Sequence, residues 1–116
     1  MGSILTSVKK MLGITEEYEH FDADIIMHIN TVFFTLTQLG VGPPEGFLIE
    51  DKESVWSDFV SGTVESEAVK SYVYLKVKLL FDSASLTSPV IEAMNRSIAE
   101  LEWRFNVAVD SKATET

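Results

Sequence analysis

Between residues 21 and 40 the apolar side chains recur at a spacing that fits one kind of regular structure. A period close to 3.6 residues predicts an amphipathic α-helix, because residues three and four apart share a face. The members of this stripe are Ile25, Ile26, Ile29, Val32, Phe33, Leu36 and Leu39. Met27 and Phe34 lie off the stripe, so we expect more than one side of this helix to contact protein.

Local signals mark both ends of this helix. Asp22 is a favourable N-cap, and Asp24 adds negative charge to the first turn. Phe21 can pack onto Ile26 as a hydrophobic staple. Gly40 is a natural C-terminal stop, so the sequence predicts a helix that opens at Asp22 and ends at Gly40.

Two shorter segments also carry helical patterns. Residues 4–12 place apolar side chains at helical spacing between a capping Ser3 and a stop at Gly13. Residues 53–60 indicate a short helix with apolar and aromatic residues on one side, closed by Gly62. Each is too short to be stable alone, so its apolar face must dock on the rest of the chain.

The last helix is predicted to open with Ser88 as N-cap and Pro89 at the first helical position. Its apolar stripe comprises Val90, Ile91, Met94, Ile98, Leu101 and Phe105. Residues 110–116 are small and polar, and we expect a flexible tail there. The domain proper is therefore predicted to span residues 1–109.

The segment before this helix is ambiguous. Residues 72–81 alternate between apolar and polar side chains, which taken alone is a strand pattern. The same residues also fit a helical face, and no second segment alternates to give a strand its partner. We therefore predict a helix from Ser66 to Phe81 that is apolar around much of its circumference. Such a helix is usually central, or shared with a neighbouring subunit.

Residues 41–52 form the one long connection. The run Gly42-Pro43-Pro44-Glu45-Gly46 excludes a helix and predicts a turn-rich loop. The three residues that follow it are apolar and must pack against protein. These are Phe47, Leu48 and Ile49.

Composition limits the function classes. The 116 residues suit one domain, and the absence of cysteine excludes disulfides and thiolate chemistry. No apolar run is long enough to span a bilayer, and the N-terminal lysines stand in the wrong place for a secretory signal. A net charge of −9 does not suit a protein that grips nucleic acid by its phosphates. It is compatible with a surface past which DNA slides.

No residue set predicts a chemical centre. His20, Asp22, Asp24 and His28 have a metal-like composition, but the aspartates are explained as cap and helix-dipole residues. The histidines stand in no nucleophile–base context, and the prolines of the Gly42–Gly46 run remove the amides that a phosphate loop needs. We expect no catalytic residues, no metal, no cofactor and no enzyme activity.

Aromatic residues are the better candidates for function. Trp56 and Trp103 each lie near the end of an amphipathic helix, and tryptophan is common both in cores and at interface hot spots. Phe59 and Phe105 are expected in the core. The complete set of interface candidates is Phe47, Leu48, Ile49, Trp56, Tyr72, Tyr74 and Trp103.

The order of these segments resembles a known family. A short helix ending Val-Lys-Lys-Met-Leu-Gly-Ile (8–14) precedes Phe-Asp-Ala-Asp-Ile-Ile (21–26) and a helix ending Gln-Leu-Gly-Val-Gly-Pro (38–43). Then follow Lys-Ser-Tyr-Val-Tyr-Leu-Lys-Val-Lys-Leu-Leu-Phe-Asp (70–82) and Ile-Ala-Glu-Leu-Glu-Trp-Arg (98–104). The chain resembles the small head–tail connector, or adaptor, proteins of tailed bacteriophages and of prophages in Gram-positive bacteria. One departure is the turn after Asp82, which reads Ser83-Ala-Ser-Leu-Thr-Ser-Pro89 without the earlier prolines expected there.

The resemblance implies an all-α fold of four main helices plus a short one, forming a small bundle in a homo-oligomeric ring of about a dozen copies. It also implies a place at the head–tail junction of the virion after synthesis in the bacterial cytoplasm. The ring's partners would be the portal protein and a tail or stopper protein, with DNA only passing through its channel and no membrane contact. A small acidic helical binding or regulatory module, such as a DNA-mimicking inhibitor, is the alternative.

Overall fold

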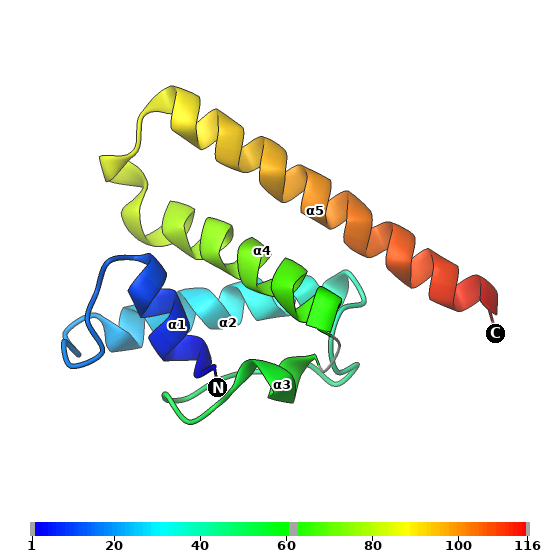
Figure 1. The fold of residues 1–116 in the computed structure, drawn as a ribbon, viewed down its shortest axis with the longest axis horizontal. Helices are drawn as coiled ribbons and strands as arrows, with labels where there is room; N and C mark the ends of the chain where they lie inside the picture. Colours follow the sequence, from blue (N-terminus) through cyan, green and yellow to red (C-terminus); the bar gives the residue numbers. More distant parts are fainter. Residues whose placement is uncertain (1, 61–62, 116) are drawn as a thin grey trace.

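The computed structural model describes the backbone of residues 2–60 and 63–115, and the side chains of residues 2–60 and 66–109. This part of the chain is all-α (Figure 1). Its helices are α1 (Ile4–Met11), α2 (Asp22–Gln38), α3 (Trp56–Phe59), α4 (Thr63–Asp82) and α5 (Ser88–Glu115), with a 3-10 turn at Ser83–Ser85. The predicted fold class of four main helices and one short helix is confirmed.

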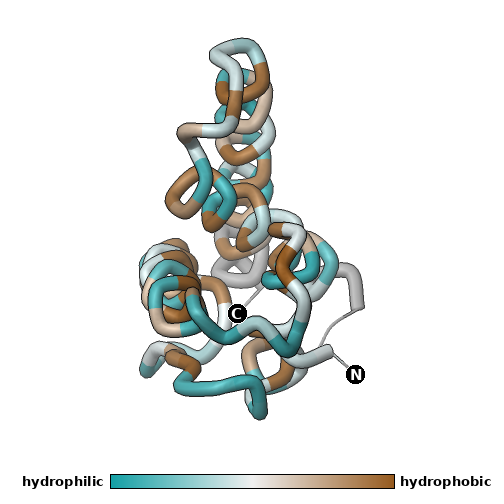
Figure 2. The backbone as a smooth tube through the Cα atoms, turned by 90° about the vertical axis from the view of Figure 1, so that its left-hand side faces the viewer, coloured by the Kyte–Doolittle hydropathy of each residue, from teal (hydrophilic) through white to brown (hydrophobic). Residues whose placement is uncertain are grey.

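The centre of the fold is α4. It packs against α1, α2 and α5, and its residues Val69, Tyr72, Val73 and Val77 are buried. In Figures 1 and 2, α5 forms the upper edge of the molecule, α4 lies beneath it, and the remaining elements lie below. The helical prediction for residues 66–81 is confirmed, because the alternating pattern belongs to a helix that is covered on several sides.

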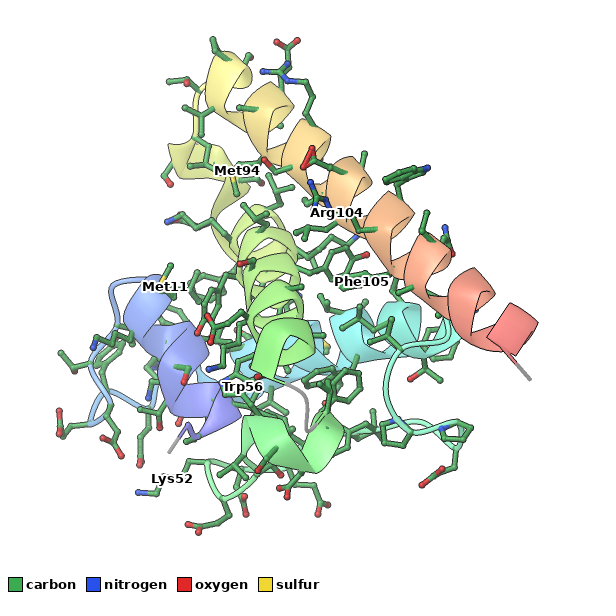
Figure 3. The ribbon with its side chains drawn as sticks, turned by 45° about the vertical axis from the view of Figure 1, so that its right-hand side comes forward. Met11, Lys52, Trp56, Met94, Arg104 and Phe105 are labelled. Atoms are coloured by element: carbon green, nitrogen blue, oxygen red, sulfur yellow. The ribbon has the colours of Figure 1, made fainter. Side chains whose placement is uncertain are left out.

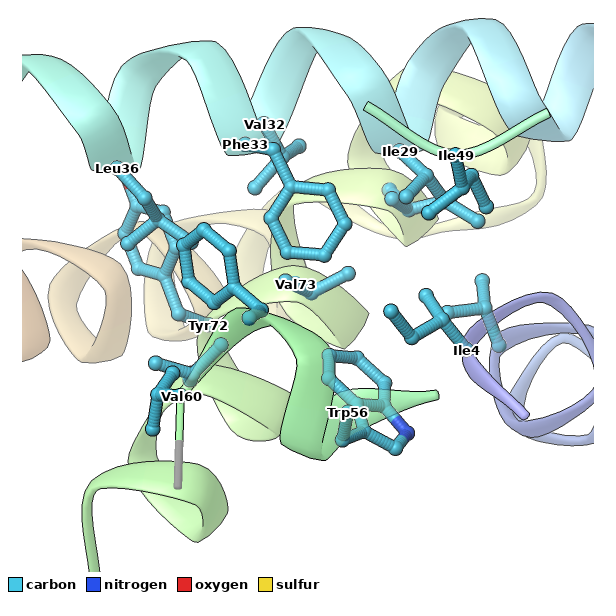
Figure 4. Packing of buried hydrophobic residues seen from close by; sticks show 14 of the residues in the cluster. Ile4, Ile29, Val32, Phe33, Leu36, Ile49, Trp56, Val60, Tyr72 and Val73 are labelled. Atoms are coloured by element: carbon cyan, nitrogen blue, oxygen red, sulfur yellow. The ribbon is translucent and has the colours of Figure 1, made fainter. Parts of the chain in front are cut away.

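The main core fills the space between α1, α2, α4 and α3 (Figure 4). Phe33 of α2 is its aromatic hub, with ring centroids 4.5 Å from Phe59, 5.2 Å from Phe47 and 6.3 Å from Trp56. Packed aromatic rings of this kind stabilise a core beyond their buried area. The loop of residues 41–55 is thereby held against α2 in its middle, at Phe47, and by the helix α3 that follows it.

Helix ends follow the predicted signals at α1 and at the end of α2. Ser3 Oγ accepts a hydrogen bond from the Thr6 amide, and Gly13 takes a positive φ of 81° just after α1. Gly40 likewise follows α2 with a φ of 86°. Glycine has no Cβ penalty in this region, which is why it ends helices there.

The start of α2 corrects the sequence interpretation. Phe21 occupies the N-cap position without a side-chain hydrogen bond, and Asp22 is the first helical residue. Asp22 instead faces Lys9 of α1, whose Nζ lies 2.8 Å from Asp22 Oδ1 and donates to the Glu16 carbonyl at 3.0 Å. Asp22 Oδ1 makes no aligned hydrogen bond, so the contact with Lys9 is an ion pair. The Asp22 carboxylate therefore pairs with Lys9 of another helix and does not act as the predicted N-cap of α2.

The remaining boundaries differ slightly from expectation. The short helix α3 is confined to residues 56–59, and Gly62 lies outside the described residues. Helix α5 begins at Ser88 itself, since the Thr87 carbonyl already accepts from the Ile91 amide. Its backbone is helical through Glu115, into the segment for which we expected a tail. None of the helices, over their described residues, is both long and apolar enough to cross a membrane.

Replacing Lys9 with alanine is expected to lower the free energy of unfolding by about 2 kcal/mol, because only 2% of its side chain is exposed and Asp22 would be left without its counter-ion. The neighbouring exposed Lys10 provides the control, and Lys10→Ala should change stability by less than about 0.5 kcal/mol. Urea denaturation followed by tryptophan fluorescence measures the free energy of unfolding of both variants, because the buried Trp56 becomes exposed on unfolding. Equal midpoints for the two variants would contradict a structural role for the ion pair.

Gly42 and Gly46 offer a second matched pair, since both have positive φ. A Cβ on Gly42 would overlap the ring of Phe59, which is held in the aromatic cluster, whereas a Cβ on Gly46 meets nothing. Gly46→Ala should therefore cost about 1 kcal/mol from backbone strain alone. Gly42→Ala should cost clearly more, by thermal or urea unfolding, and similar losses in both variants would contradict the packing of Phe59 on this turn.

Candidate interaction surfaces

Large apolar side chains are exposed on the face of α2 that points away from α4. Met27, Phe34 and Leu48 are 58%, 62% and 68% exposed, respectively. Two shallow hollows adjoin them and share Phe34 as a common wall. One is lined by Ala23, Ile26, Met27, Asn30, Thr31 and Phe34, and the other by Phe34, Thr37, Glu45, Gly46, Phe47 and Leu48. We call Met27, Phe34, Leu48 and these two hollows the α2 surface.

The local structure explains why these residues face outward. Successive helical residues are about 100° apart, so burying Phe33 turns Phe34 toward solvent. The Asn30 side chain donates to the Ile49 carbonyl at 3.0 Å and accepts from the Ile49 amide at 2.8 Å. This pair of bonds holds Ile49 in the core, and its neighbour Leu48 is left on the outside close to Phe34.

A second apolar surface lies on α5. Trp103 is 65% exposed and Val107, one turn further along, is 43% exposed. Ala99 and Arg96 are exposed at positions i−4 and i−7 from Trp103, so all four share one face of the helix. We call these four residues the α5 surface. The opposite face carries Phe105, which is buried and points toward α4 in Figure 3.

The rotation of α5 is set by one contact with α4. Tyr72 Oη donates to Glu102 Oε2 at 2.6 Å, and the Tyr72 ring lies edge-on to Phe105 with centroids 5.6 Å apart. Burial, together with the nearby Glu102 carboxylate, raises the pKa of Tyr72 far above its ordinary value of 10.0. Tyr72 is thus a protonated donor at any physiological pH, and Trp103 is held facing outward.

A third, smaller hollow lies where α1, α4 and α5 meet. Met11 and Met94 face it from α1 and α5 (Figure 3), together with Val8, Leu12, Tyr74, Leu75 and Lys78. Its volume is about 180 Å³. That is below the roughly 300–1,000 Å³ of sites that enclose drug-sized ligands.

Charge is divided unevenly along the fold. Residues 2–60 contain ten acidic and three basic side chains, whereas residues 63–115 contain eight acidic and six basic side chains. One of the three basic residues in the first part is the buried Lys9. The half of the molecule built from α1, α2, α3 and their loops is therefore strongly acidic, and the α4–α5 half is close to balanced.

The seven interface candidates from the sequence separate by burial. Ile49, Trp56 and Tyr72 are core residues, 1%, 4% and 0% exposed, and of the three Trp56 lines an open hollow beside Gly2 and Lys70. The Trp56 indole donates to Ser7 Oγ at 3.3 Å, so even its polar atom is engaged. The half-buried candidates are Phe47 and Tyr74, and the exposed ones are Leu48 and Trp103.

Phe34, Met27 and Val107 are exposed apolar residues that were not among the interface candidates predicted from the sequence. A signal was present for the first two, because their position off the buried stripe of α2 marks them as apolar residues without a place in the core. Val107 had no such signal. Its exposure depends on the rotation of α5 that Tyr72 and Glu102 determine.

The histidine and aspartate cluster is dispersed in the structure. Asp22 pairs with Lys9, and the His20 ring lies 4.8 Å from Phe21. The His28 ring lies 6.4 Å from Phe81. Across the described residues, no group of three or more metal-binding side chains comes together.

Fold and surfaces together define an all-α protein whose prominent features are apolar patches suited to contact with other proteins. The family model described as "Phage connector protein" matches residues 4–112. Because this match covers nearly the whole chain, the protein belongs to the phage connector family, a structural family of the virion. Its role is accordingly structural, in contact with other virion proteins, and the connector family inferred from segment order is confirmed. Searches of curated proteins and of solved structures found no match.

Replacing Tyr72 with phenylalanine is expected to lower the free energy of unfolding by about 1–2 kcal/mol at neutral pH, because the half-buried Glu102 carboxylate loses its donor. Wild-type stability should also fall as pH rises above 10.0, since the unfolded chain then gives up this proton before the folded chain does. Tyr72→Phe should reduce that alkaline loss.

Urea midpoints on both sides of this pH measure the effect. Tyr18→Phe is the control, because Tyr18 is 51% exposed and its loss should leave the alkaline response unchanged. An alkaline loss in Tyr72→Phe as large as in the wild type would contradict the role assigned to this hydrogen bond.

Proposed function

We propose that this protein is the repeating subunit of a head–tail connector ring, with about a dozen copies between the portal and the tail or stopper protein. The ring leaves an axial channel through which DNA passes. The observation that carries the proposal is the family match over residues 4–112, taken with two separate exposed apolar surfaces on one small domain. The protein is made in the bacterial cytoplasm and becomes part of the virion.

The amount of exposed apolar surface supports an assembly role. Exposed apolar residues scattered singly are normal in a monomer, whereas contiguous patches mark interaction sites. The α2 surface is contiguous, since Phe34 walls both of its hollows. A subunit enclosed by neighbours on both sides would cover such surfaces, and an isolated monomer would leave them in water.

The acidic half of the molecule supports the passage of DNA without binding. A wall that holds DNA by its phosphates needs clustered lysine and arginine. Residues 50–58 carry Glu50, Asp51, Glu53 and Asp58 against the single Lys52. We place this acidic loop near the channel, where like charge keeps the DNA from adhering.

Two segments are assigned to the partners above and below the ring. The loop of residues 42–49 presents its exposed turn Gly42-Pro43-Pro44, and the polar C-terminal residues 110–115 form the last part of the long helix α5. At 28 residues, α5 is about 42 Å long at 1.5 Å per residue, close to the 46 Å longest dimension of the molecule. A helix of this length reaches from one end of the subunit to the other and can meet a partner there.

The test is association with the portal protein encoded in the same phage genome. The tagged portal ring is expected to retain this protein in a pull-down, and electron microscopy of the complex should show an added ring at one end of the portal. An unrelated helical protein of similar size and net charge controls for charge-driven adsorption, and the retained amount should survive a moderate rise in salt.

A monomer in isolation is compatible with the proposal, because connector subunits can assemble on the portal. Failure to bind the portal ring at both low and moderate salt would overturn the proposed connector function. Binding instead to a DNA-processing enzyme of the host, with loss of its DNA affinity, would support the acidic regulatory module that the sequence left as the alternative.

A further inference from the structure

We infer that the α2 surface of one copy receives the α5 surface of the next copy, so that the ring closes through a single repeated head-to-tail contact. This inference rests on the proposed ring. A cyclic assembly of many copies requires two different, mutually complementary patches on each subunit. The protein carries two such patches, and their shapes, positions and charges suit one another.

The shapes are complementary. The α2 surface has two hollows on either side of Phe34, and both lie open to solvent in this chain. The α5 surface presents a projecting side chain, Trp103, of which 65% is exposed. An aromatic anchor seated in an apolar hollow is the usual form of an interface hot spot.

The positions allow repetition. Both α2 and α5 pack on α4, and each turns its apolar surface away from it. In Figure 1 α5 runs along the upper edge of the subunit and α2 lies below α4, and the two helices approach one another near Gly40 and Val109. A copy that uses its α5 surface keeps its α2 surface free for the following copy.

Charge favours this pairing over contact between two α2 surfaces. Asp24 lies on the exposed side of α2 and Glu45 lines one hollow, while α2 and residues 43–48 contain no lysine or arginine. Two α2 surfaces face to face would juxtapose these carboxylates with no compensating charge. The α5 surface brings Arg96, which is exposed, while the adjacent Arg104 already pairs with Glu100 of the same helix at 3.5 Å. Opposite charge at the rim of an interface fixes its register and excludes like-charged pairings.

The absence of cysteine makes the contact directly testable by thiol cross-linking. Thr31→Cys places a thiol in a hollow of the α2 surface, and Ala99→Cys places one beside Trp103, with the proposed anchors left intact. A short bis-maleimide is applied to each single variant, to their mixture and to the double variant, at high protein concentration and again on the portal ring. Ser71→Cys, exposed on α4, is the control.

The head-to-tail contact predicts a distinct pattern. Each single variant should remain uncross-linked, the mixture should yield dimers and nothing larger, and the double variant should yield a ladder. Trp103→Glu added to the double variant should abolish at least nine-tenths of that ladder, because it buries a charge in the hollow.

Other patterns overturn the inference. Dimers in Thr31→Cys or Ala99→Cys alone would mean a symmetric contact of like surfaces. Absence of cross-links in variants that still bind the portal would remove this contact and leave the connector function intact. Absence of both the cross-links and the portal binding would overturn the contact and the proposed function together. A ladder of cross-linked products without portal binding would retain the contact and refute only the connector function.

Discussion

The burial of α4 on three sides is the constraint on which the rest of the structure depends. Val69, Val73 and Val77 lie on it with no exposed surface, and α1, α2 and α5 each complete part of their own packing against it. A helix that is apolar around most of its circumference has no stable place at the edge of a small domain. With α4 central, α2 and α5 each pack a different part of their length against it, and they approach one another where Gly40, just after α2, lies close to Val109 of α5.

Exposed apolar surface follows from this arrangement. Helix α5 has 28 residues, and the described elements pack against one of its faces. On the inner face of α5, Ile98 and Phe105 are buried. On its outer face, Trp103 is left exposed by the described part of the chain. The subunit is therefore stable through one core while its outer helices retain faces suited to a neighbour. Both α2 and α5 therefore have one face in the core and another face open to solvent.

Much of the fold could be predicted because its signals are local. The apolar periodicity predicted the helices. Gly13 and Gly40 marked two helix ends correctly, because the ability to adopt a positive φ without strain is a property of glycine itself. Asp22 was misassigned because a distant partner, Lys9, competed with the helix end for its carboxylate. A helix N-cap and an ion pair with a distant residue use the same carboxylate oxygens, and the sequence alone does not show which of the two contacts forms.

Which apolar residues the fold leaves exposed was harder to predict, for a related reason. Ile49, Trp56 and Tyr72 have the composition of hot spots, yet the fold uses them as core. Composition cannot separate the two uses, because an interface core and a protein core select the same side chains. Position relative to the buried stripe separates them better. Phe33 and Phe34 are identical in chemistry and adjacent in sequence, and the 100° between them assigns one to the aromatic hub and the other to the surface. The apolar residues exposed on α2 are thus those that the core leaves unused, because the neighbouring described elements bury one face of this helix and leave the other open.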